Sequence, residues 1–200
     1  MLTVLSGHFR RAWHPLTAAL LFLPQFTAML GAAYDALEGI CMTDLPYHRE
    51  RAVAYARQWA LHRNPAYYDF ENIGGDCTNF ASQCIYAGAA VMNFKPVTGW
   101  YYRSSYDRAA AWTGVEYLYQ FLTGNSGPGP HGRIVPPWEA QPGDIAQLGS
   151  RAGIFYHSPV ITAVSPTILV AAHTFDALDK PLYSYPFDTL RILHIDGVRS

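Results

Sequence analysis

The segment Gly74-Gly75-Asp76-Cys77-Thr78-Asn79-Phe80-Ala81-Ser82-Gln83-Cys84 decides the expected fold and carries the candidate chemistry. Its two glycines allow a backbone turn that other residues enter only at a steric cost. Asp76 is a favourable N-cap, and the apolar or small residues after it recur at helical spacing, at Phe80, Ala81, Cys84 and Gly88. We therefore predict a helix that begins near Cys77.

Cys77 is the candidate nucleophile of this segment. In the first turn of a helix, unpaired backbone amides and the helix dipole stabilise an anion, so a thiol there can ionise near neutral pH. The alternative for a free cysteine is a small buried hydrophobe, and Cys84 on the apolar stripe fits that role. A polar, glycine-flanked helix start suits a core residue poorly, so we assign the chemistry to Cys77. With Cys41 the chain has three cysteines, too few and too uneven for a disulfide framework.

Around this segment the chain changes from helical to extended patterns. Residues 43–46 look like a helix start, and an amphipathic stripe from Ala52 to Trp59 ends at Asn64-Pro65. A further helix is expected over 109–122, and the Gly- and Pro-rich stretch 124–142 is expected to be loop. Strands are predicted over 144–148, 158–164, 167–172 and 191–195. Helices first and an antiparallel sheet afterwards indicate an α+β fold.

A nucleophilic cysteine needs a base, and the strand pattern selects two of the eight histidines. If Ser165-Pro166 is a two-residue hairpin turn, the numbers of paired residues sum to about 331, by the antiparallel pairing rule. His157 then lies opposite Thr174, and His173 lies opposite Ser158. The two histidines therefore share one end of the hairpin, where a base and a residue that orients it would be adjacent.

Composition excludes two classes of protein. The chain has 5 Trp, 14 Tyr and 10 Phe in 200 residues and only 14% charged residues, unlike a disordered chain. Its 14 Lys and Arg balance 15 Asp and Glu without a basic cluster, unlike a nucleic-acid binder. Cys77, His157, His173 and Asp176 are zinc-ligand types, but they lack metal-ligand spacing, so we expect neither metal nor cofactor.

Residues 1–41 differ from the rest of the chain, and we treat them as a leader before a domain over 42–200. Arg10-Arg11, an apolar stretch from Leu16 to Ala33 and small residues at its end fit a secretory signal peptide or an anchor. A packed N-terminal helix or a start assigned too early are the alternatives. A signal in residues 1–33 would imply a secreted or envelope protein, and otherwise a cytoplasmic one. We expect no stable membrane span in the mature domain.

The motifs resemble the bacterial "putative amidase" domain. The resemblance rests on the segment 74–83 and spans roughly Thr43 to Phe187, with agreeing pieces in family order. These are Tyr47-His48-Arg49, Asn64-Pro65-Ala66-Tyr67, Trp100-Tyr101-Tyr102, Gln141-Pro142-Gly143-Asp144, His157-Ser158 and His173-Thr174-Phe175-Asp176. That domain belongs to the papain-like cysteine hydrolases, which include the NlpC-type cell-wall endopeptidases. The resemblance thus implies a papain-like fold, with the nucleophile at a helix start packed on a C-terminal antiparallel sheet.

By position, the resemblance implies Cys77 as nucleophile and His157 as general base. His173 is the expected third triad member, with Asp176 as the alternative, and Asn72 or Tyr68 would assist the Cys77 amide in the oxyanion hole. The expected reaction is amide hydrolysis through a thioester, by a monomer, on a peptide or amide substrate such as peptidoglycan. The alternatives are a papain-like binding module without turnover and an acyltransferase that uses the same residues.

Overall fold

The computed structural model describes residues 42–200, so the expected leader lies outside the described residues. These residues form a mixed helix and antiparallel-sheet fold, which confirms the α+β prediction. The helices are α2 (Arg49–Trp59), α3 (Cys77–Ala89), α4 (Ala110–Thr113) and α5 (Val115–Gly124), with single 3-10 turns η1 (Pro137–Glu139) and η2 (Leu182–Ser184). The strands are β1 (Asp44–Leu45), β2 (Gly129–Val135), β3 (Ile145–Gly149), β4 (Phe155–His157), β5 (Val160–Ala163), β6 (Leu169–Ala172), β7 (Ala177–Pro181) and β8 (Thr189–Arg199).

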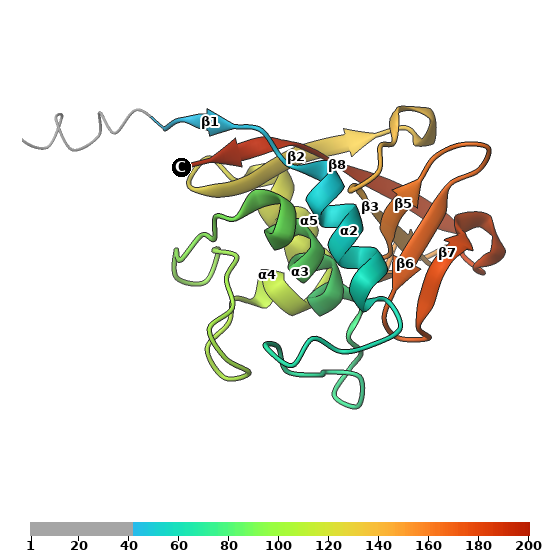
Figure 1. The fold of residues 1–200 in the computed structure, drawn as a ribbon, viewed down its shortest axis with the longest axis horizontal. Coiled ribbons are helices and arrows are strands. Elements are labelled where there is room, and N and C mark those ends of the chain that lie inside the picture. The colour runs from blue at the N-terminus through green and yellow to red at the C-terminus, as the bar shows by residue number, and fades with distance from the viewer. Residues whose placement is uncertain (1–41) are drawn as a thin grey trace, which may run out of the picture. The chain divides into compact units, whose positions relative to one another are not determined.

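The strands form one curled antiparallel sheet in the order β1-β8-β3-β5-β6-β7, with β2 paired to β8 and β4 paired to β3. Strand β8 runs through the centre and pairs with β1, β2 and β3. Helices α2 and α3 pack side by side, and the β5-β6-β7 meander lies beyond α2 (Figure 1). The C-terminal strand therefore organises one part of the sheet, and the meander forms the other.

The two faces of the sheet bury two separate hydrophobic cores. Ile145, Val160 and Leu193 belong to the core shared with the helices, together with Phe80, Trp100 and Trp112. Their chain neighbours Ala146, Ile161 and Ile192 belong to a second core on the other side. This alternation follows from the two-residue period of a strand. Trp100 and Trp112 are fully buried in the first of these cores.

The predicted hairpin register is confirmed for two pairs of β5 and β6, whereas His157 lies on β4 and pairs with Leu148 on β3 and not with Thr174. Val160 pairs with Ala171 and Ile161 pairs with Val170, and both pairs sum to 331. At the other end a bulge shifts the pairing, so Ala163 pairs with Leu169 and the connection is longer than a two-residue turn. The apolar alternation set the register near the site even though the turn was assigned too short.

Three expected element boundaries were wrong. The helix over 109–122 is two helices, because Gly114 adopts an extended conformation between α4 and α5. Residues 43–46 start no helix: Asp44–Leu45 pair with β8, and α2 begins only at Arg49. The expected loop 124–142 contains β2, which pairs with β8 along its length. Gly132 permits that pairing, because a Cβ there would lie 2.0 Å from the His194 carbonyl oxygen.

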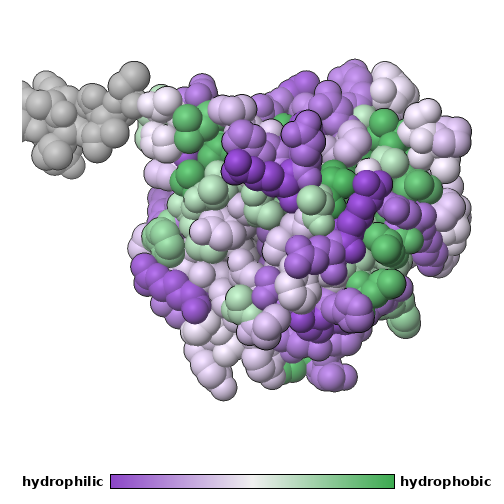
Figure 2. Space-filling view, viewed as in Figure 1, coloured by the Kyte–Doolittle hydropathy of each residue, from purple (hydrophilic) through white to green (hydrophobic). Residues whose placement is uncertain are grey.

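The surface of the described part mixes polar and apolar residues. Figure 2 shows hydrophobic side chains on one face gathered in several separate groups among hydrophilic ones. Within residues 42–200, none of the helices combines the length and apolar character that crossing a membrane requires.

Candidate active site

The loop before α3 folds as its glycines require. Gly74 and Gly75 have φ angles of 103° and 99°, which favour glycine, and α3 begins at Cys77 as predicted. A Cβ on Gly75 would also lie only 3.1 Å from the Thr174 hydroxyl. The loop is therefore pressed against the turn between β6 and β7, which brings the segment around His173 to the start of the helix.

Asp76 occupies the N-cap position of α3 but makes no capping hydrogen bond. Its Oδ1 accepts the Phe70 backbone N–H at 2.9 Å and the Asn79 side-chain amide at 2.8 Å. Its Oδ2 lies 2.6 Å from Nδ1 of His173. The Asp76 carboxylate therefore does not cap α3 as expected but links Phe70, Asn79 and His173. The backbone amides of the first turn receive no side-chain acceptor from Asp76.

The Cys77 thiol is free, nearly buried and next to the Thr78 hydroxyl. Its residue is 7% exposed, and its sulfur lies 3.7 Å from the Thr78 hydroxyl. The nearby backbone of Ser158 and Thr78 favours the thiolate. Burial outweighs these contacts and raises the pKa of the thiol, which contradicts our expectation of a lowered value.

A buried polar network fixes the strand that faces the thiol. The Thr78 hydroxyl donates to Oγ of Ser158 at 3.2 Å, and Nε2 of Gln147 donates to the same oxygen at 3.2 Å. Gln147 also donates to the Val115 carbonyl at 2.8 Å. These contacts join α3, β3 and α5 at the junction between β4 and β5, and hold the Ser158 backbone beside the sulfur.

His157, the residue before Ser158, is buried and has one unpaired ring nitrogen among residues 42–200. It pairs with Leu148 across the sheet and is 7% exposed. Its Nε2 is buried without a hydrogen-bond partner among residues 42–200. Burial, aided by the Lys180 charge, lowers the pKa of His157 to about 4, so the ring is neutral at pH 7. Within the described residues no hydrogen bond joins it to Cys77.

His173 is fully buried and both its ring nitrogens are engaged. Nδ1 contacts Asp76, and Nε2 lies 2.9 Å from the Trp59 carbonyl, which can only accept. Nε2 therefore carries a proton, and a second proton is shared with the Asp76 carboxyl group. The ring also stacks on Phe80 at 4.0 Å between centroids. The structure thus joins His173 to Asp76, next to the nucleophile, and not to His157.

The other expected site residues lie around the same loop. Asp176 contacts Arg63 at 2.9 Å, on the turn after β6. Arg63 also contacts Asp69 and Glu71, and Glu71 accepts the Thr174 backbone N–H at 3.1 Å. Asn72 and Tyr68 are both exposed on the segment before α3. Tyr68 accepts the Asn79 amide through its backbone carbonyl, which leaves its hydroxyl at the surface.

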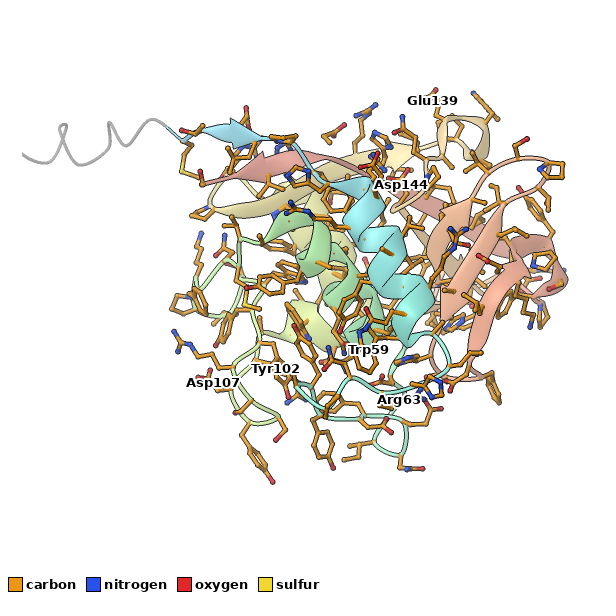
Figure 3. All side chains as sticks on the ribbon, in the orientation of Figure 1. Trp59, Arg63, Tyr102, Asp107, Glu139 and Asp144 are labelled. Carbon is orange, nitrogen blue, oxygen red and sulfur yellow. The ribbon has the colours of Figure 1, made fainter. Side chains whose placement is uncertain are left out.

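Sequence reasoning missed a second Asp–His pair at the far end of α2. The Asp144 carboxylate contacts Arg49 at 2.6 Å and Nδ1 of His194 at 2.9 Å, and Arg49 also donates to the Ile195 carbonyl. Asp144 lies near the start of α2, whereas Trp59 lies near its end (Figure 3). The two pairs therefore fasten opposite ends of α2. The sequence signal for this pair was the presence of Arg49 and Asp144 in two of the motifs that carry the family resemblance.

Neither a cluster of metal-ligand side chains nor the pocket beside α5 adds to this site. Within residues 42–200, no three His, Cys, Asp or Glu side chains group to hold a metal ion. A pocket of about 560 Å³ lies between α5 and the segments 93–98 and 124–128, and neither Cys77 nor either histidine lines it. The candidate active site is therefore the start of α3, where the buried polar side chains of Asp76, Thr78 and His173 lie close together.

Comparison with known proteins identifies the family. The profile of the Putative amidase domain matches residues 46–195. The chain belongs to this family. It is similar to the uncharacterized protein YhbB of Bacillus subtilis (strain 168), with 33% identity over 136 residues, 66% of this chain. The match spans only 42% of that protein. No solved structure matches the chain.

Proposed function

We propose that the protein is a cysteine-dependent amide hydrolase of papain-like type, with Cys77 as nucleophile and His157 as general base. The observation that carries the proposal is the position of the Cys77 thiol. Cys77 opens α3, its sulfur lies 3.7 Å from the Thr78 hydroxyl, and the nearby Ser158 backbone favours the thiolate. Ser158 directly follows His157, whose neutral imidazole has a buried Nε2 without a hydrogen-bond partner among residues 42–200. The backbone of the residue after the proposed base therefore lies beside the nucleophile, while the His157 ring itself packs against Tyr185.

The reaction begins from a neutral thiol and a neutral imidazole, since burial disfavours both charges. The Cys77 proton passes to His157 as the sulfur attacks the amide carbonyl, and the imidazolium then protonates the departing amine. Water hydrolyses the thioester with His157 again as base, which regenerates the thiol. Hydrogen bonds absent from a resting enzyme commonly form only with substrate, so the Cys77–His157 contact closes on binding.

The carbonyl oxygen becomes negative during attack and needs donors. The Cys77 backbone N–H stands at a helix start that Asp76 does not cap, and it supplies one donor. Asn72 or Tyr68 supplies a side-chain donor from the exposed loop before α3. We propose peptide amides as substrates, including stem peptides of peptidoglycan, and a monomeric enzyme.

The test is labelling with a cysteine-directed acyl probe, followed by mapping of the modified residue. We expect modification of Cys77 and none of Cys84, which is fully buried. Release of amino groups from peptidoglycan or peptide amides should be lost in Cys77→Ser and retained in the matched control Cys84→Ser. Labelling at Cys84 but not Cys77 would overturn the assignment.

Further measurements separate the alternative activities. Activity lost with a chelator but kept after alkylation would indicate a metal enzyme. A Cys77→Ser variant with full biological effect would indicate a binding module without turnover. Products that incorporate an added amine would indicate acyl transfer, because the amine then takes the place of water.

A further inference from the structure

The pocket beside α5 is a cavity that the proposed reaction does not use. Its volume of about 560 Å³ falls within the range of roughly 300–1,000 Å³ that small-molecule sites occupy in proteins. Its two walls are the segment 93–98, which follows α3, and the segment 124–128 between α5 and β2. Cys77 is not among the residues that line it, so a ligand could bind here without the proposed nucleophile.

One buried side chain, Asn93, fastens the two walls of the pocket to each other. Its Oδ1 accepts the Lys95 backbone N–H at 2.9 Å. Its Nδ2 donates to Oδ1 of Asn125 at 3.2 Å and to the Pro128 carbonyl at 2.9 Å. Its backbone also pairs with that of the fully buried Trp100 through two hydrogen bonds. The pocket is therefore formed before a ligand arrives, which lowers the entropic cost of binding.

The lining combines buried apolar residues with exposed polar ones. Ala111 and Phe121 are buried, whereas Tyr117, on the same helix as Phe121, is 57% exposed. Thr98 and Gln120 are also exposed, and their side chains form no hydrogen bond within residues 42–200. An aromatic ring next to free hydroxyl and amide groups suits a sugar. The ring packs on the C–H face of the sugar, and the polar groups bind its hydroxyls.

Lys95 gives the pocket a positive charge. It is the one charged residue of the lining among residues 42–200, and it takes part in none of the ion pairs formed there. The second lysine of this part, Lys180, lies over the Tyr185 ring at 3.9 Å instead. An ammonium without a carboxylate partner, at the edge of a formed pocket, attracts an anion.

We propose that this pocket binds a sugar that carries a carboxylate. The Lys95 ammonium donates to the carboxylate, Tyr117 packs on the sugar ring, and the side chains of Thr98 and Gln120 bind its hydroxyl groups. The inference goes beyond the proposed amide hydrolysis, because binding at this place requires neither Cys77 nor His157.

Isothermal titration calorimetry of the full chain tests the charge requirement. The probes are N-acetylmuramic acid and N-acetylglucosamine, which differ by one lactyl carboxylate. We expect the acid to bind about tenfold more tightly, the lower end of the effect of a hydrogen bond to a charged group, since Lys95 is exposed. Lys95→Gln should remove that difference, and the matched control Lys180→Gln should keep it. Equal affinities for the two sugars, or a difference that survives in Lys95→Gln, would overturn the inference.

A second variant tests the location. Gly124 lines the pocket, and a Cβ there would meet no atom within 4 Å, so Gly124→Leu adds a side chain without a clash. We expect N-acetylmuramic acid to bind this variant at least about tenfold more weakly, and wild-type affinity would show that the sugar binds elsewhere. Free lactate should bind wild type far more weakly than the sugar acid, and equal binding would show that the sugar ring is not recognised.

The proposed nucleophile is tested apart from this site. The variant Cys77→Ser should bind N-acetylmuramic acid with wild-type affinity even though it loses amide hydrolysis. Loss of binding in Cys77→Ser would contradict a separate site. Binding that depends on Lys95 and Gly124 in a protein without hydrolytic activity would support the inference and leave only the proposed function refuted.

Discussion

Replacing His157 by Gln should remove a pH-dependent loss of stability. The native pKa of about 4 lies below the ordinary value of 6.5, so the unfolded chain binds a proton that the folded chain does not. Stability contributed by the neutral ring is complete above pH 6.5 and falls as pH is lowered. Linkage gives a loss of about 2 kcal/mol by pH 5 and about 3 kcal/mol by pH 4, since each pKa unit is worth about 1.36 kcal/mol.

The assay is urea unfolding of wild type and His157→Gln at pH 7.5, 6.5, 5.5 and 5.0. All other ionisable groups are common to both proteins and cancel in the difference. We expect the free energy of unfolding of the variant to fall less steeply, by about 2 kcal/mol between pH 7.5 and 5.0. Parallel curves would refute a buried, neutral and unpaired His157.

Three further substitutions test the packing of the site by urea unfolding. Asp76→Ala should lower stability by roughly 3–5 kcal/mol, because it leaves His173 buried without its partner. An effect near zero would contradict the bracing role. Gly132→Ala should cost about 1–3 kcal/mol, because the added Cβ meets the His194 carbonyl, and an unchanged midpoint would exclude that contact. Cys84→Ala should cost roughly 1–2 kcal/mol and leave Cys77 alkylation unaltered, whereas slower alkylation would link the two cysteines.

The fold was predictable where local pattern and tertiary pairing agree. The apolar alternation around Val160 and Ala171 set the β5–β6 register, because a one-residue slip would expose the buried face. Strand β2 was not predictable in the same way. Its glycines and proline read as loop signals, yet Gly132 is required by the close approach of β8, a contact distant in sequence. Gly114 likewise interrupts the helix that the apolar periodicity predicted over 109–122.

The candidate site shows the same division. The start of α3 at Cys77 and the burial of Cys84 follow from glycine, spacing and apolar pattern. The partners of Asp76 could not be predicted from the sequence. An N-cap is a local interaction, and here the buried contact of Asp76 with His173 takes its place. The direction of the Cys77 pKa also depends on burial, which the helix-start argument omits.

Strand β8 gives the domain a constraint on the order of its assembly. Because Thr189–Arg199 pairs with β1, β2 and β3, segments that are synthesised early wait for a partner translated near residue 199. Contacts so far apart in sequence slow folding, and strands with unpaired edges associate with other chains in the meantime. Synthesis from the ribosome should therefore expose these strands for longer than the local β5–β6 hairpin, and molecular chaperones that bind extended apolar segments should find them first.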